Sequence, residues 1–206
     1  MTHPGRFIVF EGGEGSGKST QAGLLAHRLG AVLTREPGGT EIGARLRDIV
    51  LGDTNLLLPR TEALLMAADR AQHVAEVVRP ALEHGQDVVS DRFSGSSLAY
   101  QGYGRGLELG DLAGLSSWAA DGLEPDLVVL LDVGQEEAAA RRCRPRDRIE
   151  AAGDTFHQRV VAGYRALAAA DPVRWVVVDG SGRVDDVSER VWSAYEAWAA
   201  AAGAPG

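Results

Sequence analysis

The stretch FIVFEGGEGSGKST, residues 7–20, runs from an apolar segment into the spacing Gly12-x-x-x-x-Gly17-Lys18-Ser19. Glycines in such a loop let backbone N–H groups turn toward an anion, and a following helix adds its positive dipole end. Lys18 can reach the terminal phosphates, and the Ser19 hydroxyl can ligate magnesium. A glycine-rich turn that matches by chance is the alternative, but the helix-like pattern after the loop favours a nucleoside triphosphate site. The expected loop residues are Gly12, Gly13, Glu14, Gly15, Ser16, Gly17, Lys18, Ser19 and Thr20.

Composition and charge narrow the class of protein. The hydrophobic fraction of 45% and charged fraction of 24% are ordinary for a soluble globular protein, and 206 residues suit one domain. A net charge of −8 argues against a nucleic-acid-coating role. Cys143 is the only cysteine, no apolar run reaches membrane-spanning length, and the N-terminus has no signal-peptide character. We therefore expect a single cytoplasmic domain over residues 1–206, with neither nucleic acid nor membrane as partner.

Strand-like and helix-like patterns alternate along the chain without a repeat or a long linker. The expected strands are 6–11, 31–34, 88–91, 127–132 and 173–179. The expected helices are 18–29, 41–51, 60–84, 94–101, 109–120, 135–142, 154–170 and a last amphipathic one through Val187, Val191, Tyr195 and Trp198. Pro80 should bend or divide the long helix. The alternation predicts an α/β fold, a three-layer α/β/α sandwich whose central parallel sheet holds ligands beyond its carboxyl ends. The phosphate loop indicates that this fold is of the P-loop NTPase type.

Further motifs follow the loop in a fixed order. They are TREPGG at 34–39, AADRAQH at 67–73, DRF at 91–93, AYQG at 99–102, PDL at 125–127 and DRIE at 147–150. Together they resemble bacterial thymidylate kinases, a family of P-loop nucleoside monophosphate kinases, over nearly the whole chain. The resemblance implies a transferase that moves the γ-phosphoryl group of ATP to dTMP in dTTP synthesis, giving dTDP and ADP with Mg²⁺ as cofactor. It also implies a homodimer, with ATP and dTMP as the small-molecule substrates.

The resemblance assigns several positions to the acceptor base and sugar. Arg70 is expected to read thymine O4, while Ser97 and Gln101 contact the base. The Tyr100 ring is expected against the sugar, where a 2′-hydroxyl would project. Met66 stands where the family carries a stacking aromatic residue, although its thioether can still cover a ring. The alternatives are a plain core role for Met66 and a solvated helix charge for Arg70.

The acceptor phosphate and the metal need charged residues at the ends of strands. The resemblance assigns Arg47 and Arg92 as clamps on the acceptor phosphate, a role that suits bidentate donors. Asp91, at the end of an expected strand, should bind magnesium or its waters together with Ser19. A plain salt bridge between the adjacent charges of Asp91 and Arg92 is the alternative.

Three glutamates need separate roles. Glu14 would repel ATP phosphates if it pointed into the loop, so it should face the acceptor, near the sugar 3′-hydroxyl as in the family. Glu36 should touch acceptor-phosphate water or magnesium, and the alternative is a turn carboxylate that caps the backbone. Glu11 is expected to be structural or bound to water around the metal.

A basic run at residues 141–148 completes the expected site. The family has one variant with a catalytic arginine in the phosphate loop and another with it in a lid. This loop contains only Lys18 as a basic residue, which indicates the lid variant, with a short basic lid at about 141–153. We expect the catalytic residues to be Lys18, Arg92, Arg144, Arg146 and Arg148. Two alternative functions are a kinase with another nucleoside or nucleotide acceptor and a non-catalytic nucleotide-binding switch.

Overall fold

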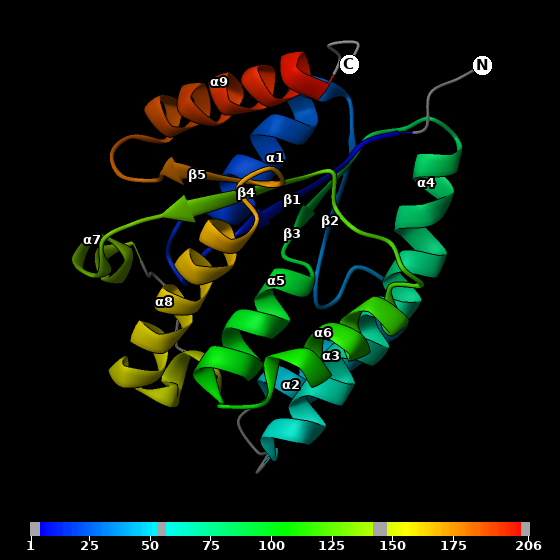
Figure 1. Ribbon diagram of the computed structural model, residues 1–206, viewed down its shortest axis with the longest axis vertical. Helices are drawn as coiled ribbons and strands as arrows, with labels where there is room; N and C mark the ends of the chain where they lie inside the picture. The colour runs from blue at the N-terminus through cyan, green and yellow to red at the C-terminus, as the bar shows by residue number, and fades with distance from the viewer. Residues whose placement is uncertain (1–4, 53–56, 142–147, 203–206) are drawn as a thin grey trace.

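The computed structural model describes residues 5–52, 57–141 and 148–202 (Figure 1). The centre of the described chain is a five-stranded parallel sheet in the order β2-β3-β1-β4-β5. Its strands are β1 (Phe7–Glu11), β2 (Val32–Arg35), β3 (Val88–Asp91), β4 (Leu127–Asp132) and β5 (Trp175–Asp179). β1 lies in the middle and is buried on both faces, which explains its uninterrupted apolar run.

Helices cover both faces of this sheet, as the alternating pattern predicts (Figure 1). The helices are α1 (Lys18–Leu29), α2 (Glu41–Leu51), α3 (Pro59–His73), α4 (Arg79–Glu83), α5 (Ser94–Ser97), α6 (Leu109–Ala119), α7 (Gln135–Ala140), α8 (Asp154–Ala170) and α9 (Val184–Ala202). Two π-helical segments, η1 (Val74–Val78) and η2 (Leu98–Gly104), and the short 3₁₀ turn η3 (Glu150–Ala152) complete the described elements. None of the described helices combines the length and apolarity that a membrane crossing needs.

Alternating strand residues divide the core between the two faces. Ile8 and Phe10 pack in one cluster with residues of α1 and α9, whereas Phe7 and Val9 pack in a second cluster with residues of η1 and α4. A third cluster joins η2 to α8. The sheet is therefore the middle of three layers, and the predicted fold class is confirmed.

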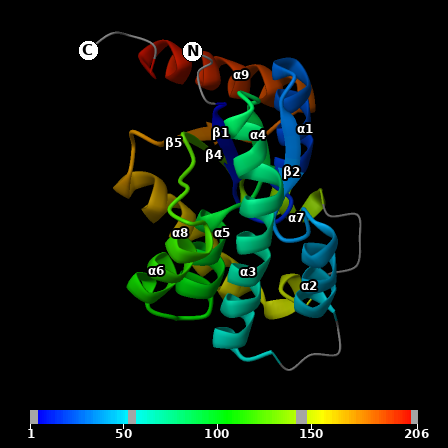
Figure 2. The ribbon, with the colours of Figure 1, turned by 90° about the vertical axis from the view of Figure 1, so that its right-hand side faces the viewer.

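The expected helix at 60–84 is present, but a wide turn divides it. Figure 2 shows α3, η1 and α4 continuing one another along the molecule, with the π-helical segment between the two α-helices. Pro80 has no N–H to donate to the preceding turn, and the backbone N–H of Arg79 donates to Val74 O across the wider loop. The expected helix at 94–101 is likewise α5 followed by η2, and it extends to Gly104.

The remaining expected elements agree with the structure to within two residues at each end. The carboxyl ends of β1, β2 and β3 lie side by side, because Phe10 and Arg35 both pair with Asp91. The phosphate loop, the TREPGG motif and the DRF motif therefore open at one edge of the sheet.

Candidate active site

The loop between β1 and α1 has a backbone that favours glycine. Gly15 has a φ of +77°, and a Cβ there would lie 2.2 Å from the carbonyl oxygen of Ala138. Lys18 folds back into the loop, where its Nζ donates to Gly13 O at 2.7 Å and to Ser16 Oγ at 3.3 Å. Burial lowers the pKa of Lys18 to about 8. The loop therefore holds a buried ammonium group that donates hydrogen bonds to two oxygen atoms of the loop.

Ser19 and Asp91 lie next to each other at the start of α1. The Ser19 hydroxyl donates to Asp91 Oδ2 at 2.5 Å, and Asp91 Oδ1 is buried without a hydrogen-bond partner among the described residues. A hydroxyl and a carboxylate are the hard oxygen ligands that magnesium prefers. No group of three or more His, Cys, Asp or Glu within the described ranges could hold a metal. These two side chains fit an ion that takes its other ligands from water or phosphate.

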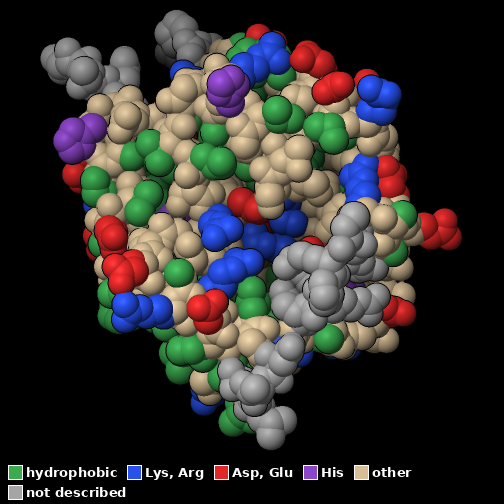
Figure 3. All heavy atoms as spheres, turned by 180° about the vertical axis from the view of Figure 1, so that it is seen from behind, with side chains coloured by type: hydrophobic (Ala, Val, Ile, Leu, Met, Phe, Trp, Pro, Cys, Tyr) green, Lys and Arg blue, Asp and Glu red, His purple; other side chains and the backbone are tan. Residues whose placement is uncertain are grey.

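A cavity of about 270 Å³ opens between the phosphate loop, the end of β2 and η2. Among the described residues, three arginines line it, namely Arg35, Arg47 and Arg92. Figure 3 shows Lys and Arg side chains gathered in a hollow of one face of the molecule. Arg35 belongs to the TREPGG motif, but the sequence assigned it no role of its own. Its position at the end of β2, beside Asp91, is where a ligand-facing side chain is expected. The cavity is suited to an anion such as a phosphate.

Arg92 is held in place by a dense set of contacts. Its φ of +76° is uncommon for a residue other than glycine. Its guanidinium donates to Ser96 Oγ at 3.1 Å, Tyr164 Oη at 3.0 Å and Tyr100 Oη at 3.2 Å. Glu14 lies 3.7 Å away as its ion-pair partner. Arg92 therefore meets the expected acceptor-side acid, Glu14, instead of forming only a salt bridge with its neighbour in sequence.

Glu11 binds two of the residues that hold Arg92, namely Ser96 and Tyr164. It is fully buried and accepts hydrogen bonds from the backbone N–H groups of Phe93 and Ser96, from Ser96 Oγ and from Tyr164 Oη. Burial raises the pKa of Glu11, and the hydrogen bond from Ser96 opposes that rise. The structural alternative for Glu11 is therefore the one that its contacts support.

Arg70 and Glu36 form a buried ion pair at 2.9 Å. Arg70 also donates to Ser97 Oγ and Ser116 Oγ, each at 3.1 Å, and His73 Nδ1 lies 2.9 Å from the other oxygen of Glu36. Arg70 is thus not a solvated helix charge, and the carboxylate of Glu36 contacts side chains where a turn cap would contact the backbone. Glu36 still lines the cavity, so its contact with acceptor-phosphate water or magnesium stays a prediction.

The other expected acceptor residues divide into two groups. Met66 and Tyr100 line the cavity, and Met66 also packs against the core cluster that contains Tyr100. Ser97 and Gln101 are buried and lie outside the cavity lining. Two of the four therefore line the cavity, and a contact of Ser97 or Gln101 with the base stays a prediction.

The basic run is described only at its two ends. Arg144 and Arg146 lie outside the described residues. Arg148 donates from Nε to Val50 O at 2.9 Å and from Nη2 to Glu62 at 2.6 Å. Arg141 bridges Gly180 O and Gly182 O, at 2.9 Å and 3.0 Å, and so ties the end of α7 to the loop after β5.

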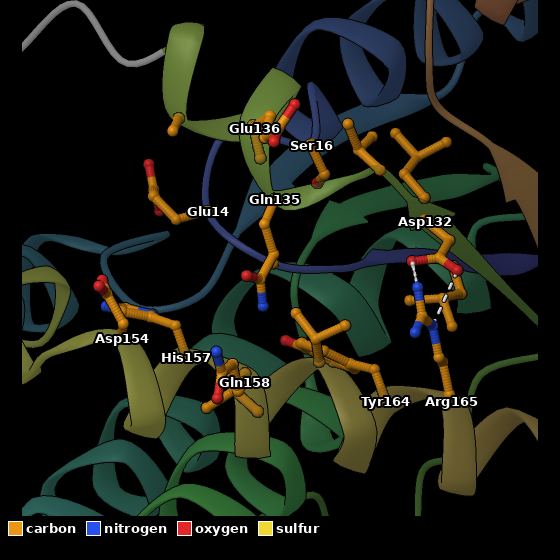
Figure 4. A pocket seen from close by; sticks show the side chains of 18 residues that line it. Glu14, Ser16, Asp132, Gln135, Glu136, Asp154, His157, Gln158, Tyr164 and Arg165 are labelled. Carbon is orange, nitrogen blue, oxygen red and sulfur yellow. Dashed lines mark hydrogen bonds and ion pairs between the residues drawn. The ribbon is translucent and has the colours of Figure 1, made fainter.

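Asp132 is the last residue of the apolar strand β4, and it forms an ion pair with Arg165. Arg165 binds both of its carboxylate oxygens, at 2.9 Å and 3.0 Å. A second cavity of about 310 Å³ lies here, between the phosphate loop, α7 and α8. Figure 4 shows Asp132 and Arg165 facing each other at one end of that cavity, away from Glu14. This pairing favours a structural role for Asp132.

The chain matches a family model described as thymidylate kinase over residues 10–191. The thymidylate kinase of Leifsonia xyli subsp. xyli is 53% identical over 196 residues, which are 91% of this chain and 93% of that protein. The thymidylate kinase of Clavibacter michiganensis subsp. michiganensis is 47% identical over 205 residues, covering 96% and 97% of the two chains. The thymidylate kinase of Synechococcus sp. (strain JA-3-3Ab) is 50% identical over 193 residues, covering 91% and 93%.

Proposed function

Because this chain belongs to the thymidylate kinase family, we infer that it is an enzyme that transfers the γ-phosphoryl group of ATP to dTMP. The observation that carries this inference is that the phosphate loop and the expected acceptor residues border the same cavity. The phosphate loop with Lys18 lies on one side, and the arginine-lined cavity that includes Met66 and Tyr100 lies on the other. A triphosphate in the loop and a monophosphate nucleotide in the cavity would therefore bring donor and acceptor phosphates together.

Phosphoryl transfer demands positioning and positive charge more than covalent chemistry. We assign Lys18 to the terminal phosphates of ATP, and Arg92 and Arg47 to the acceptor phosphate. Tyr100 and Ser96 fix the guanidinium of Arg92, so its donors are already oriented when the acceptor arrives. Pre-oriented charges stabilise a transition state more effectively than charges that must first rearrange.

Glu14 is assigned to the sugar of the acceptor. Its carboxylate points toward Arg92, at 3.7 Å, which supports an acceptor-facing orientation. Arg35 is added to the acceptor-phosphate clamp because it lines the same cavity. Met66 forms part of the wall against which the base would stack.

Magnesium is the cofactor that the site would hold through Ser19 and Asp91. When bound, it neutralises charge on the phosphate oxygens. The buried, unpartnered Oδ1 of Asp91 supports this assignment, since a carboxylate oxygen in that state lacks a donor or cation.

We propose that one of the lid arginines supplies the last positive charge. Arg144 and Arg146 remain candidates from the sequence. Arg148 donates hydrogen bonds to Glu62 and to a backbone carbonyl. It could act on the transferred phosphoryl group only if these hydrogen bonds were broken.

The organisation around this site is also a proposal. We propose one catalytic domain over residues 1–206, in the cytoplasm, that pairs into a homodimer. Leu64 of α3 and Trp118 of α6 are exposed large apolar side chains on helices that contact each other, which supports an interface there. Analytical ultracentrifugation tests this, and a sedimentation coefficient of a monomer at micromolar concentration would contradict it.

An acceptor panel tests the proposed activity. ADP formation is measured with ATP, Mg²⁺ and, in turn, dTMP, dUMP, dCMP, AMP and GMP. The highest kcat/KM is expected with dTMP. A preference for another acceptor would favour another nucleotide kinase, and no ADP formation with any acceptor would favour a nucleotide-binding switch.

A further inference from the structure

A buried carboxylate, Glu62 of α3, lies at the junction of three segments of the chain. Its relative exposure is 0%. It accepts hydrogen bonds from Gln101 Nε2 at 2.8 Å, from Arg105 Nη2 at 3.1 Å and from Arg148 Nη2 at 2.6 Å. Glu62 therefore connects the helix that carries Met66 with η2 and with the start of the segment that leads to α8.

The charge of Glu62 is fixed by these partners. Burial alone would raise the pKa of Glu62, but the hydrogen bonds from Gln101, Arg105 and Arg148 outweigh it and hold the pKa below its ordinary value. Glu62 is thus ionised at neutral pH. An ionised carboxylate only accepts hydrogen bonds, so whichever amide atom of Gln101 faces it must be the nitrogen.

This constraint decides where the amide oxygen of Gln101 points. Oε1 must lie on the side away from the Glu62 contact. It is buried and has no hydrogen-bond partner among the described residues. A buried acceptor without a donor is costly, and the cost is removed when a ligand supplies an N–H. Tyr100, which precedes Gln101 in sequence, lines the acceptor cavity. Ser97, one turn earlier, accepts a hydrogen bond from Arg70.

We propose that Glu62 is a positioning residue for base recognition, which holds the Gln101 amide so that Oε1 accepts the N3–H of a keto pyrimidine. This rests on the proposed function and on the base contact that the family resemblance implies for Gln101. The new element is the role of Glu62. Thymine and uracil carry a proton on N3, whereas cytosine presents a lone pair there, which would face Oε1 unfavourably. Glu62 thereby contributes to the discrimination against dCMP without touching the base.

The substitution Glu62→Gln tests the proposal. A glutamine of the same shape can donate or accept, so the amide of Gln101 is no longer forced into one orientation. We expect the ratio of kcat/KM for dTMP to that for dCMP to fall by about tenfold, the effect of one neutral hydrogen bond. The ratio for dTMP to dUMP should not change, because both bases carry the same N3–H.

Arg105→Met is the matched control. It removes one of the two guanidinium groups from the same carboxylate but leaves the bond between Glu62 and Gln101 in place. Both variants should lower the melting temperature, but only Glu62→Gln should change the dTMP:dCMP ratio. A merely structural role for Glu62 would leave that ratio equal in the two variants, and this result would overturn the proposal.

A double-mutant cycle with Gln101→Met adds a second measurement. Gln101→Met removes the acceptor and should itself lower the dTMP:dCMP ratio. Adding Glu62→Gln should then have no further effect on the ratio, because Glu62 acts through Gln101. If Glu62→Gln does not fold, an unchanged ratio in Gln101→Met alone would overturn the proposal. A wild-type protein without activity on dTMP would instead refute the proposed function.

Discussion

Raising the pH from 7 to 9 should weaken ATP binding by about tenfold, because Lys18 loses its proton within that range. Burial lowers the pKa of Lys18, and the positive charge of Arg92 lowers it further, so that the pKa is about 8. A bound triphosphate favours the charged ammonium, so the pKa of Lys18 in the complex lies above this range. The apparent dissociation constant then scales as 1 + 10^(pH − 8), from about 1.1 at pH 7 to about 11 at pH 9.

Isothermal titration calorimetry with Mg·ATP at pH 7, 8 and 9 measures this effect. Repeating each titration in two buffers of different ionisation enthalpy counts the protons taken up. Nearly one proton should be taken up at pH 9, and about a tenth of one at pH 7. Lys18→Arg is the control, because a guanidinium stays charged across the range, and its affinity should not follow the same curve.

The lowered pKa of Lys18 also makes the free energy of unfolding depend on pH. The pKa of Lys18 is lower in the folded protein than its ordinary value of 10.5, so folding releases a proton between about pH 8 and 10.5. The contribution of Lys18 to the free energy of unfolding therefore increases with pH in that window. An ATP affinity that is constant between pH 7 and 9, without proton uptake, would refute the reasoning.

Three further predictions concern the acceptor side and the lid. Met66→Phe should bind dTMP equally or more tightly in a fluorescence titration, since an aromatic ring adds stacking area to the cavity wall, and a large loss would show that the wall is built for methionine. Alanine at both Arg144 and Arg146 should reduce kcat far more than ATP affinity in steady-state and binding assays, whereas unchanged turnover would exclude the lid as the source of the catalytic charge. Tyr164→Phe removes a buried hydroxyl bonded to Arg92, so chemical denaturation should show a loss of about 1–3 kcal/mol, together with a raised KM for dTMP and an unchanged KM for ATP. A fall in stability without any change in KM for dTMP would separate Tyr164 from the orientation of Arg92.

The sequence predicts most of the fold because its main signals are local. The apolar run of β4 and the pattern of α1 and α2 each depend on neighbours within a few residues, and the structure has the predicted bounds there. The π-helical segments could not be predicted from the sequence, since apolar periodicity does not distinguish an i→i+5 turn from an α-helical one. Pro80 indicated a disturbance, but the wide turn η1 lies before it.

The candidate site shows the same division. Spacing alone brings out the phosphate loop, and motif resemblance brings out Arg92, Asp91 and Tyr100. The pairing of Arg70 with Glu36 joins residues 34 positions apart, and that of Arg148 with Glu62 joins residues 86 apart. No periodic pattern predicts such pairs, because they are created by the packing of separate segments.

These buried pairs also explain how an acidic chain builds a site for anions. Removing a charged pair from water costs about as much as the pair gains, so the ion pair of Arg70 and Glu36 adds little net stability. Its effect is instead on geometry, because a lone buried charge would be far more costly than the pair, and each partner therefore holds the other in one position. The same reasoning applies to Glu62 with Arg105. The proposed acceptor side is thus held in a fixed arrangement before the substrate binds, and the cost of ordering its donors is met during folding and not during binding.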